Sequence, residues 1–389
     1  MGPLKGLTII EISGIGPGPF AGMSLADMGA NVIRVERPGG TDFSNAQEPR
    51  LDFLNRGKRC ICVNLKQREG VATVLQLLEK ADGLLEGNRP GVMERLGLGP
   101  DICLEKNPAL VYGRMTGWGQ EGPMAQVAGH DLNYVALAGA LHPIGRAGEK
   151  PAIPLNLVGD FGGGGLMLAY GMVCALLEAK TSGKGQVVDA AMIDGAATLM
   201  ASTFAASQVG FWREERGTNL LDGGAHFYEV YETSDGKYIS LGAIEPQFYA
   251  ALLETLGEDA TYFQNQWDMD NWPAMQEQMS EIIKGKTRDQ WDAVFAGVDV
   301  CYAPVLAMSE VRHHPHHQAR GTFIDDGEYW QPAPAPRFSR TQAELRGPSA
   351  RLGQHTQDIL REFGFSDRDI AEKLASKAVV GLTQAPQHA

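Results

Sequence analysis

The N-terminal part of the chain constrains the fold most strongly. An apolar run begins at residue 7, a turn rich in glycine and proline follows at 14–19, an amphipathic segment covers 21–28, and a second apolar run occupies 31–35. Short apolar runs on either side of a helical pattern are typical of a βαβ unit with parallel strands. The chain therefore begins with the repeating unit of a parallel sheet covered by helices.

The same pattern continues through the first half of the chain. Strand-like runs at 60–65 and 110–115 alternate with helical stretches such as 71–79, which predicts a mostly parallel sheet. Residues 164–179 carry few polar side chains, so we expect a buried helix there that packs against the sheet. The predicted fold class is α/β, with a large doubly wound, Rossmann-like domain.

The character of the sequence changes after residue 200. Charged and turn-forming residues come first, and 227–243 then alternates apolar and polar residues as an antiparallel hairpin does. Helical patterns follow near 247–256 and 267–283. We predict the first part of a large domain at 1–200, a linker at 201–224, a smaller α+β domain at 225–306, a return linker at 307–340, and C-terminal helices at 341–389 that return to the large domain.

Charge and cysteine content exclude several classes of protein. The formal net charge of -13 argues against general affinity for nucleic acid or anionic membranes. Five cysteines, an odd count, indicate thiols in a reducing compartment, and the alternating Cys60 and Cys62 are expected on one face of a strand. No stretch has the length and apolarity of a membrane span, and the start lacks a signal-peptide pattern, so we expect no membrane association and a cytoplasmic location. A matrix or peroxisomal location stays the alternative.

A glycine pattern at 14–18 follows the first strand and precedes a helix, as a dinucleotide-binding fingerprint does. Pro19 stands where the third glycine of that fingerprint belongs, and Pro17 and Pro19 remove amide donors that a pyrophosphate would need. We therefore favour a turn that shapes the edge of the sheet. A nicotinamide site stays the alternative.

A cluster of basic residues lies in the first quarter of this acidic chain. Its members are Arg37, Arg56, Lys58, Arg59, Lys66, Arg68, Arg89 and Arg95. Arginine forks and lysine ammonium groups hold phosphates, which suits a 3'-phosphorylated ADP. We expect phosphate contacts from Arg37, Arg89 and Arg95, and a solvated surface position for Lys58 and Arg68.

Candidate acid/base groups lie beside predicted helix starts. His130 stands directly before a helix that Asp131 and Asn133 are suited to cap, and free amides at that point could stabilise an enolate oxygen. Asp160 precedes four glycines, in a loop that another molecule could approach closely. Glu245 ends a predicted strand and could orient His130 across a domain interface. Purely structural capping and turn roles are the alternatives for all three.

Four histidines, at 313, 314, 316 and 317, suggest a metal site at first sight. Pro315 disrupts helical spacing, and no acidic or cysteine partner lies at the spacing of a zinc ligand. We therefore predict a loop and no metal site, with zinc as the alternative.

A set of segments is more informative than any single motif. Its members are Ala-Asn-Val-Ile-Arg-Val-Glu-Arg-Pro-Gly-Gly at 30–40, Leu-Asn-Arg-Gly-Lys-Arg at 54–59, Glu-Arg-Leu-Gly-Leu-Gly-Pro at 94–100, Thr-Gly-Trp-Gly-Gln-Glu-Gly-Pro at 116–123, Gly-His-Asp-Leu-Asn-Tyr at 129–134, Gly-Asp-Phe-Gly-Gly-Gly-Gly at 159–165, Gly-Ala-Ile-Glu-Pro-Gln-Phe-Tyr at 242–249 and Ala-Pro-Val at 303–305. Together they resemble the class III CoA-transferase superfamily, and specifically its α-methylacyl-CoA racemase branch, over essentially the whole chain to about residue 365.

The resemblance implies an interlocked homodimer, in which a large and a small domain are joined by long linkers and each active site lies between subunits. It implies that His130, with Glu245 behind it, is one acid/base group and that Asp160 is the other. It also implies a set of residues that line the CoA site. These are Arg37, Val63, Asn64, Leu65, Lys66, Gly87, Asn88, Arg89, Arg95, Gly129, Asp131, Leu132, Asn133 and Tyr134.

The implied activity is interconversion of (R)- and (S)-2-methylacyl-CoA thioesters, by abstraction of the α proton and reprotonation through an enolate. CoA is then part of the substrate, and no separate cofactor or metal is expected. A transferase that works through a covalent aspartyl-CoA intermediate at Asp160 is the alternative within the superfamily. An acyl-CoA binding protein without catalysis is a third hypothesis. The sequence leaves the acyl group open.

Overall fold

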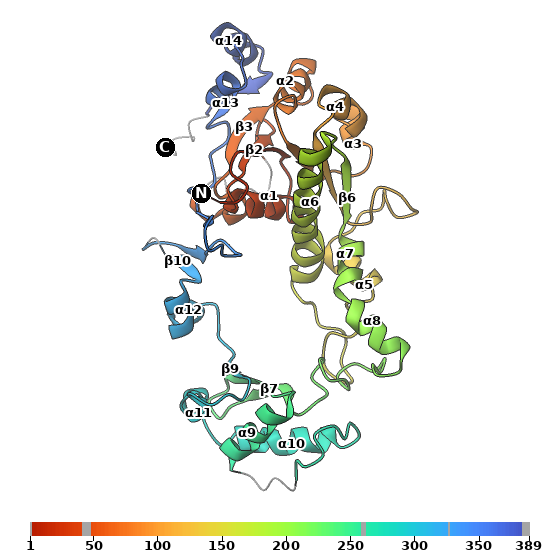
Figure 1. Cartoon of the computed structure of the whole chain (residues 1–389), viewed down its shortest axis with the longest axis vertical. Helices are drawn as coiled ribbons and strands as arrows, with labels where there is room; N and C mark the ends of the chain where they lie inside the picture. Colours follow the sequence, from red (N-terminus) through yellow and green to blue (C-terminus); the bar gives the residue numbers. More distant parts are fainter. Residues whose placement is uncertain (1, 41–47, 258–261, 326, 383–389) are drawn as a thin grey trace. The chain divides into compact units, whose positions relative to one another are not determined.

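The computed structural model describes residues 2–40, 48–257, 262–325 and 327–382. The chain forms two compact units (Figure 1). The first unit comprises Met1–Ala138, Leu155–Leu199 and Phe323–Ala389, and the second comprises Gly139–Pro154 and Met200–Thr322. The chain therefore crosses from one unit to the other several times, and each unit is described separately below.

Seven strands of the described chain form one sheet in the first unit, in the order β12-β3-β2-β1-β4-β5-β6. Their bounds are β1 (Thr8–Ile12), β2 (Asn31–Glu36), β3 (Arg59–Val63), β4 (Gly83–Glu86), β5 (Val111–Thr116), β6 (Val187–Ala191) and β12 (Val379–Val380). Along this order, each pair of neighbouring strands from β3 through β2, β1, β4 and β5 to β6 is parallel. Only β12 pairs antiparallel, with β3. The strand order reverses between β1 and β4, as it does in a doubly wound sheet. The predicted large parallel sheet is confirmed.

Helices cover both faces of this sheet. Consecutive strand residues point to opposite faces, so Ile10 and Ile33 join one core. The helices of this core are α2 (Arg68–Leu78), α4 (Pro100–Lys106), α13 (Thr356–Glu362) and α14 (Asp367–Ala375). Ile9 and Val32, one residue earlier in each strand, join a second core with α1 (Pro17–Asp27) and α6 (Met167–Ser182). Because both faces are buried, the strands are continuous apolar runs, which is why the sequence predicts a parallel sheet.

The helices of the first unit follow the predicted pattern closely. They are α1 (Pro17–Asp27), α2 (Arg68–Leu78), α3 (Val92–Leu96), α4 (Pro100–Lys106), α5 (Asp131–Leu137), α6 (Met167–Ser182), α7 (Met192–Leu199), α13 (Thr356–Glu362) and α14 (Asp367–Ala375), with short 3-10 turns at Pro49–Leu51 and Phe53–Asn55. The first helix begins at Pro17, because the fixed backbone angle of proline suits the first position of a helix and its missing N–H loses no bond there.

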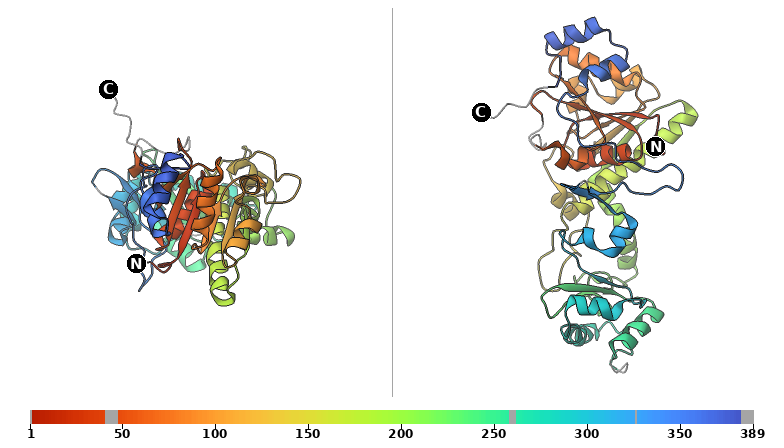
Figure 2. Two further views of the ribbon diagram at one scale, coloured as in Figure 1. Left: turned by 90° about the horizontal axis from the view of Figure 1, so that it is seen from above. Right: turned by 90° about the vertical axis from the view of Figure 1, so that its left-hand side faces the viewer.

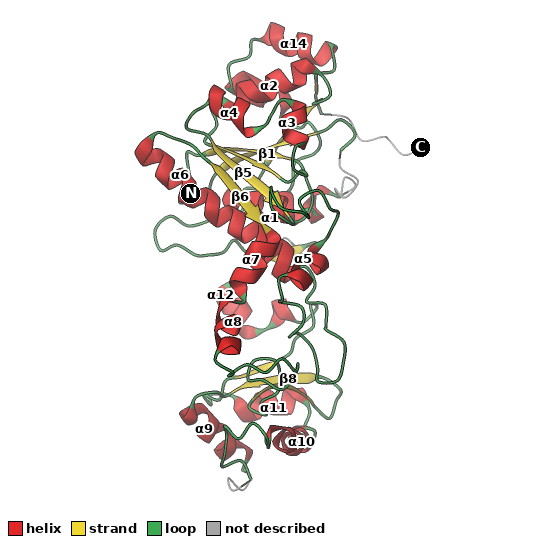
Figure 3. Ribbon diagram, turned by 90° about the vertical axis from the view of Figure 1, so that its right-hand side faces the viewer, coloured by secondary structure: helices red, strands yellow, loops and turns green. Residues whose placement is uncertain are grey.

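The predicted buried helix at 164–179 is part of a longer element. A π-helix, η3 (Leu157–Leu166), runs directly into α6, which packs along β5 and β6 (Figure 3). One face of α6 is buried, but Tyr170 and Leu177 on another face are 68% and 70% exposed. The expectation of a buried helix is therefore right for the face on the sheet and wrong for the outer face.

The same element bears on the expectation that no segment could span a membrane. Within the described residues, the continuous helix Leu157–Ser182 has the length and mean hydropathy, 1.4, of a possible span. That expectation is therefore wrong as stated, because the π-helical turns extend α6 to 26 residues. This helix packs on the sheet and contributes Leu168 and Met172 to a buried core, as a core helix does.

The C-terminal segment returns to the first unit, beside β3 and α2 (Figures 1 and 2). Helix α13 packs on β3, and β12 pairs Val379 with Val63 and Val380 with Cys62. The two C-terminal helices agree with the sequence prediction, whereas the edge strand β12 is not predicted. Cys60 and Cys62 are completely buried in β3, in agreement with their predicted role as small apolar residues.

The second unit contains an antiparallel sheet of β7 (Tyr228–Glu232), β8 (Tyr238–Gly242) and β9 (Tyr302–Pro304). The helices α9 (Pro246–Leu256), α10 (Trp272–Ile283) and α11 (Arg288–Phe295) lie on one side of this sheet (Figure 3). The unit also contains α8 (Ala201–Gln208) and α12 (Pro315–Arg320). Trp272, Trp291 and Phe227 lie in its core. The predicted hairpin is present, and the helix expected from 267 begins at Trp272.

The two ranges predicted as linkers contain regular structure. The range 201–224 begins with α8. The range 307–340 contains α12 and a hairpin of β10 (Phe323–Asp325) and β11 (Trp330–Pro332). The loop expected around the four histidines is helical from Pro315 onward, because proline at the first position of a helix starts it rather than breaks it.

Candidate functional site

A cavity of about 830 Å³ opens in the first unit, where the parallel strands β1, β4 and β5 end. Its walls come from the loop 14–19, the segments that follow β4 and β5, the start of α5, and the π-helix. The carboxyl ends of β1 and β4 flank the point where the strand order reverses, which is where open α/β sheets bind ligands. His130 and Asp160 both line this cavity.

His130 is the residue that directly precedes α5, as predicted. Its backbone is extended, and its N–H donates to the side-chain oxygen of Asn133 at 3.0 Å. Asn133 thus caps the helix start and fixes the backbone of the histidine. The His130 side chain is exposed, so a ligand in the cavity could reach it.

Asp160 lies in the π-helix rather than in the predicted loop. Its carboxylate accepts a hydrogen bond from the Asn156 amide at 3.3 Å, and its backbone N–H donates to Asp131 Oδ1 at 2.6 Å. Burial raises the pKa of the Asp160 carboxyl above its ordinary value, the hydrogen bond from Asn156 opposes the rise, and the charge of Asp131 adds to it. A raised pKa helps a carboxyl group to act as an acid as well as a base near neutral pH.

The four glycines after Asp160 allow close packing between helices. A Cβ on Gly163 would lie 2.6 Å from the backbone nitrogen of Ala196 in α7, and one on Gly165 would lie 2.7 Å from the carbonyl oxygen of Pro17 in α1. From the sequence, these glycines are expected to let another molecule approach the backbone closely. In the structure that expectation is wrong for Gly163 and Gly165, because α7 and α1 occupy the space.

The loop 14–19 belongs to this site, although its sequence predicts only a turn at the edge of the sheet. Gly16 has a φ of 67°, and a Cβ there would lie 3.2 Å from Asp160 Oδ2. The ring of Phe20 stacks on that of Phe161 with centroids 4.7 Å apart. The loop therefore lies against the carboxylate of Asp160, and sequence reasoning missed this role because the contact joins segments far apart in the chain.

Lys58 is buried, contrary to the solvated position that its charge run predicts. Its ammonium group donates to Glu11 Oε1 at 2.8 Å, to the Pro19 carbonyl at 2.9 Å and to Asn55 Oδ1 at 3.1 Å. The contact with Pro19 connects this ion pair to the loop that lies against Asp160. A charge this well buried needs such partners, since an unpaired one would be costly.

The predicted CoA contacts fall into groups. Those that line the cavity with His130 are Gly87, Asn88, Arg89, Gly129, Asn133 and Tyr134. A second hollow of the first unit, of about 590 Å³, is lined by Leu65, Lys66 and Arg95 together with Arg68 of α2. The cationic groups of this hollow could hold phosphates. Arg68 is exposed, as expected, but it lies with the predicted phosphate-binding residues.

Other predicted contacts lie elsewhere. Val63 is completely buried where β3 pairs with β12, so it presents no surface to a ligand and the predicted contact is wrong for this residue. Asn64 is half-buried, and its side chain accepts from the Lys66 N–H at 3.2 Å. Arg37 is exposed at the end of β2, where its Nε donates to the Gly40 carbonyl.

Two residues near the start of α5 differ in exposure. Asp131 is 7% exposed and faces the π-helix through its contact with Asp160, whereas Leu132 is 37% exposed. Glu245 lies in the second unit, directly before α9, and its side chain is exposed. Its predicted role behind His130 stays a prediction.

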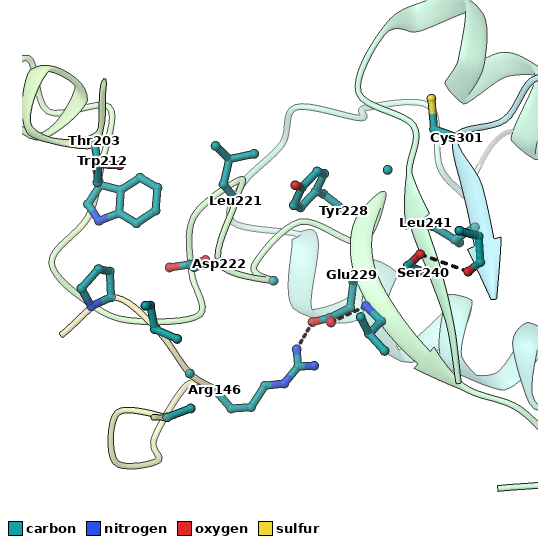
Figure 4. Close-up of a pocket in the computed structure, with 18 of the residues that line it drawn as sticks. Arg146, Thr203, Trp212, Leu221, Asp222, Tyr228, Glu229, Ser240, Leu241 and Cys301 are labelled. Carbon is teal, nitrogen blue, oxygen red and sulfur yellow. Dashed lines mark hydrogen bonds and ion pairs between the residues drawn. The ribbon is translucent and has the colours of Figure 1, made fainter. Parts of the chain in front are cut away.

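The second unit has a hollow of its own, of about 750 Å³ (Figure 4). Trp212, Leu221 and Tyr228 give it an apolar wall, and the Arg146 guanidinium forms an ion pair with Glu229 at its side. None of the residues that the sequence singles out as acid/base or CoA-binding groups lines this hollow.

Among the described residues, no group of His, Cys, Asp and Glu side chains is arranged to hold a metal ion, and the four histidines near α12 are included in this statement.

Known proteins resemble the chain over nearly its full length. The sequence profile of CoA-transferase family III matches residues 4–356. The α-methylacyl-CoA racemase of Mus musculus is 46% identical over 380 residues, which cover 97% of each protein. The succinyl-CoA:glutarate CoA-transferase of Mus musculus is 30% identical and covers 98% of this chain and 91% of its own. A CaiB/BaiF family protein from Brucella suis has a similar structure, with a TM-score of 0.80 and 27% identity over 93% of this chain and 99% of its own.

Proposed function

This chain belongs to CoA-transferase family III, and we propose that it interconverts the (R) and (S) forms of 2-methylacyl-CoA thioesters. The enzyme is an isomerase of the α-methylacyl-CoA racemase type. The identity of 46% with a racemase, against 30% with a transferase, favours racemisation over CoA transfer.

One observation carries the proposed mechanism. His130 and Asp160 come from different elements and line the same cavity. Exchange of an α hydrogen needs one group in its basic form and one in its acidic form, on opposite faces of the planar enolate. In the proposed cycle, one group removes the α proton, the other donates a proton to the opposite face, and the two groups end with exchanged protonation states. Starting from that state, the same steps run in reverse.

We propose that the substrate binds through its CoA moiety. We assign its contacts to the residues after β4 and before α5, and its phosphates to the basic hollow lined by Lys66, Arg68 and Arg95. The reaction moves a proton and no electrons, so it needs no redox cofactor. We propose that groups of the protein stabilise the enolate, so that no metal is used. Arg37 stays part of the proposed CoA site.

The proposed enzyme is an interlocked homodimer in the cytoplasm. Tyr170, Val173 and Leu177 recur at helical spacing on the outer face of α6 and are exposed to solvent in the single chain. An apolar face of this kind is typical of a protein interface. Light scattering of the purified protein tests the dimer, a Leu177→Lys variant should weaken it, and cell fractionation tests the location.

Glu245 is proposed to orient His130. A Glu245→Gln variant keeps the shape of the side chain and removes its charge. We expect slower α-hydrogen exchange with little change in KM for the thioester. An unchanged rate would contradict this role and leave the roles of His130 and Asp160 standing.

Proton NMR in heavy water tests the proposed function directly. A 2-methylacyl-CoA is incubated with the enzyme, and a parallel tube also contains a free carboxylic acid as a CoA acceptor. Loss of the α-hydrogen signal without the acceptor is the expected result. A constant signal with CoA transferred to the acid would show a transferase, and bound thioester with neither reaction would show a binding protein.

A further inference from the structure

Asp131 joins the two proposed acid/base groups. It is the neighbour of His130 in sequence, and its Oδ1 accepts the backbone N–H of Asp160 at 2.6 Å. The two aspartates are 29 residues apart, so this hydrogen bond is a tertiary contact between α5 and the π-helix. It places the backbone of Asp160 at a defined distance from that of His130.

The contact uses a hydrogen-bond donor that a helix leaves free. Asp160 lies in the first turn of the π-helix, where backbone N–H groups have no partner within the helix. A carboxylate that accepts such an N–H stabilises the helix start by a charge-assisted hydrogen bond. Because Asp131 is buried, water does not compete freely for this bond.

Gly159 leaves room for this arrangement. A Cβ at this position would lie 2.4 Å from Asp131 Oδ1 and 3.0 Å from a methyl group of Val135. Any other residue would push the Asp131 carboxylate away from the Asp160 amide. The glycine before Asp160 therefore has a specific function in this packing, separate from that of the four glycines after it.

From these contacts we infer that Asp131 is a positioning residue, which holds Asp160 in place relative to His130 so that both can act on one α carbon. The inference rests on the proposed function. It concerns the buried side chain of Asp131 and adds to its predicted contact with CoA. Asp131 itself need not touch the reacting atoms.

The test compares three variants. Asp131→Ala removes the acceptor, Asp131→Asn keeps an oxygen that can accept the Asp160 N–H, and Asp101→Ala is a control that removes an exposed aspartate from the first turn of α4. In Asp131→Ala we expect kcat for α-hydrogen exchange to fall by about 100-fold with KM within about threefold, since a displacement near 1 Å can cost that much. Asp131→Asn should recover most of the lost rate, and Asp101→Ala should match wild type.

The pH profile adds a readout that a purely structural role would not move. The charge of Asp131 raises the pKa of Asp160, whereas the hydrogen bond from Asn156 and the charge of His130 lower it. In Asp131→Asn the limb of the profile that belongs to Asp160 should therefore move to lower pH. An unmoved limb together with a fully active Asp131→Ala would overturn the inference.

Gly159→Ala gives an independent check. Alone it should reduce kcat as Asp131→Ala does, but the double variant should be little slower than Asp131→Ala, because both changes break the same contact. If the two losses multiply, the inference is wrong.

Hydrogen exchange separates this inference from the proposed function. The amide of Asp160, followed by mass spectrometry of a peptide that covers the π-helix, should exchange slowly in wild type and in Asp131→Asn and faster in Asp131→Ala. Equal exchange in all three would refute the contact whatever the enzyme catalyses. Absence of α-hydrogen exchange in wild type with this pattern intact would refute the racemase and leave the contact established.

Discussion

Removal of the Lys58 ammonium group is expected to destabilise the first unit strongly. Its Nζ lies 2.7 Å from Glu11 Oε2, and both side chains are 1% exposed. Lys58→Met keeps a chain of similar length but leaves the buried Glu11 carboxylate without the ammonium group that pairs with it. Breaking such a pair costs about 3–5 kcal/mol, which is a large part of the roughly 5–15 kcal/mol by which a domain is usually stable.

Urea unfolding followed by far-UV circular dichroism measures this loss. Lys180→Met is the matched control, because Lys180 is exposed in the last turn of α6. A double variant, Glu11→Gln with Lys58→Met, should recover part of the stability, since it buries no net charge. The recovery distinguishes a lost ion pair from a lost packing contact.

A loss below about 1 kcal/mol in Lys58→Met is what an exposed ion pair would give, and it would refute the buried pair. The buried pair would also be refuted if the double variant lost as much stability as the two single variants together. In either case the loop at Pro19 would need another support.

The remaining predictions concern the site and the second unit. His130→Ala and Asp160→Ala should each abolish α-hydrogen exchange, whereas Cys60→Ala should leave it nearly intact; wild-type rates in both site variants would contradict the mechanism. Gly16→Ala should slow α-hydrogen exchange about tenfold, because the added methyl group would contact Asp160. It should also lower the free energy of unfolding by about 1–3 kcal/mol, because alanine is strained at the φ of 67° that Gly16 adopts; unchanged kinetics would contradict the contact. Burial lowers the pKa of His226 to about 4 from 6.5. Stability should therefore be complete above pH 6.5 and fall as the pH drops toward 4, by up to about 3 kcal/mol, since the unfolded chain binds the proton first. Urea unfolding at several pH values should show this slope in wild type and not in His226→Phe.

The sequence alone was enough to predict the parallel sheet of the first unit, the hairpin of the second, and His130 and Asp160 as candidate acid/base residues. Continuous apolar runs such as 31–35 predict buried parallel strands, because a strand covered on both faces has no polar side. His130 was found because a cap-forming pattern follows it, and Asp160 because it stands between an apolar segment and a glycine run. These signals are local, so they can be read without knowing what lies across the fold.

The tertiary structure decided which distant residues meet. In the sequence, Lys58 is part of a charge run typical of a surface. In the folded chain it is buried and donates hydrogen bonds to Glu11 and to the Pro19 carbonyl. Val63 is predicted to contact CoA, but β12 pairs with its strand and buries it. Hydrophobic periodicity reports which face of an element is buried, but it carries no information about which partner buries it. The local sequence identifies Asp160 as a candidate acid/base group. It does not show which residue contacts Asp160, and only the folded chain shows that Asp131 accepts a hydrogen bond from its backbone N–H.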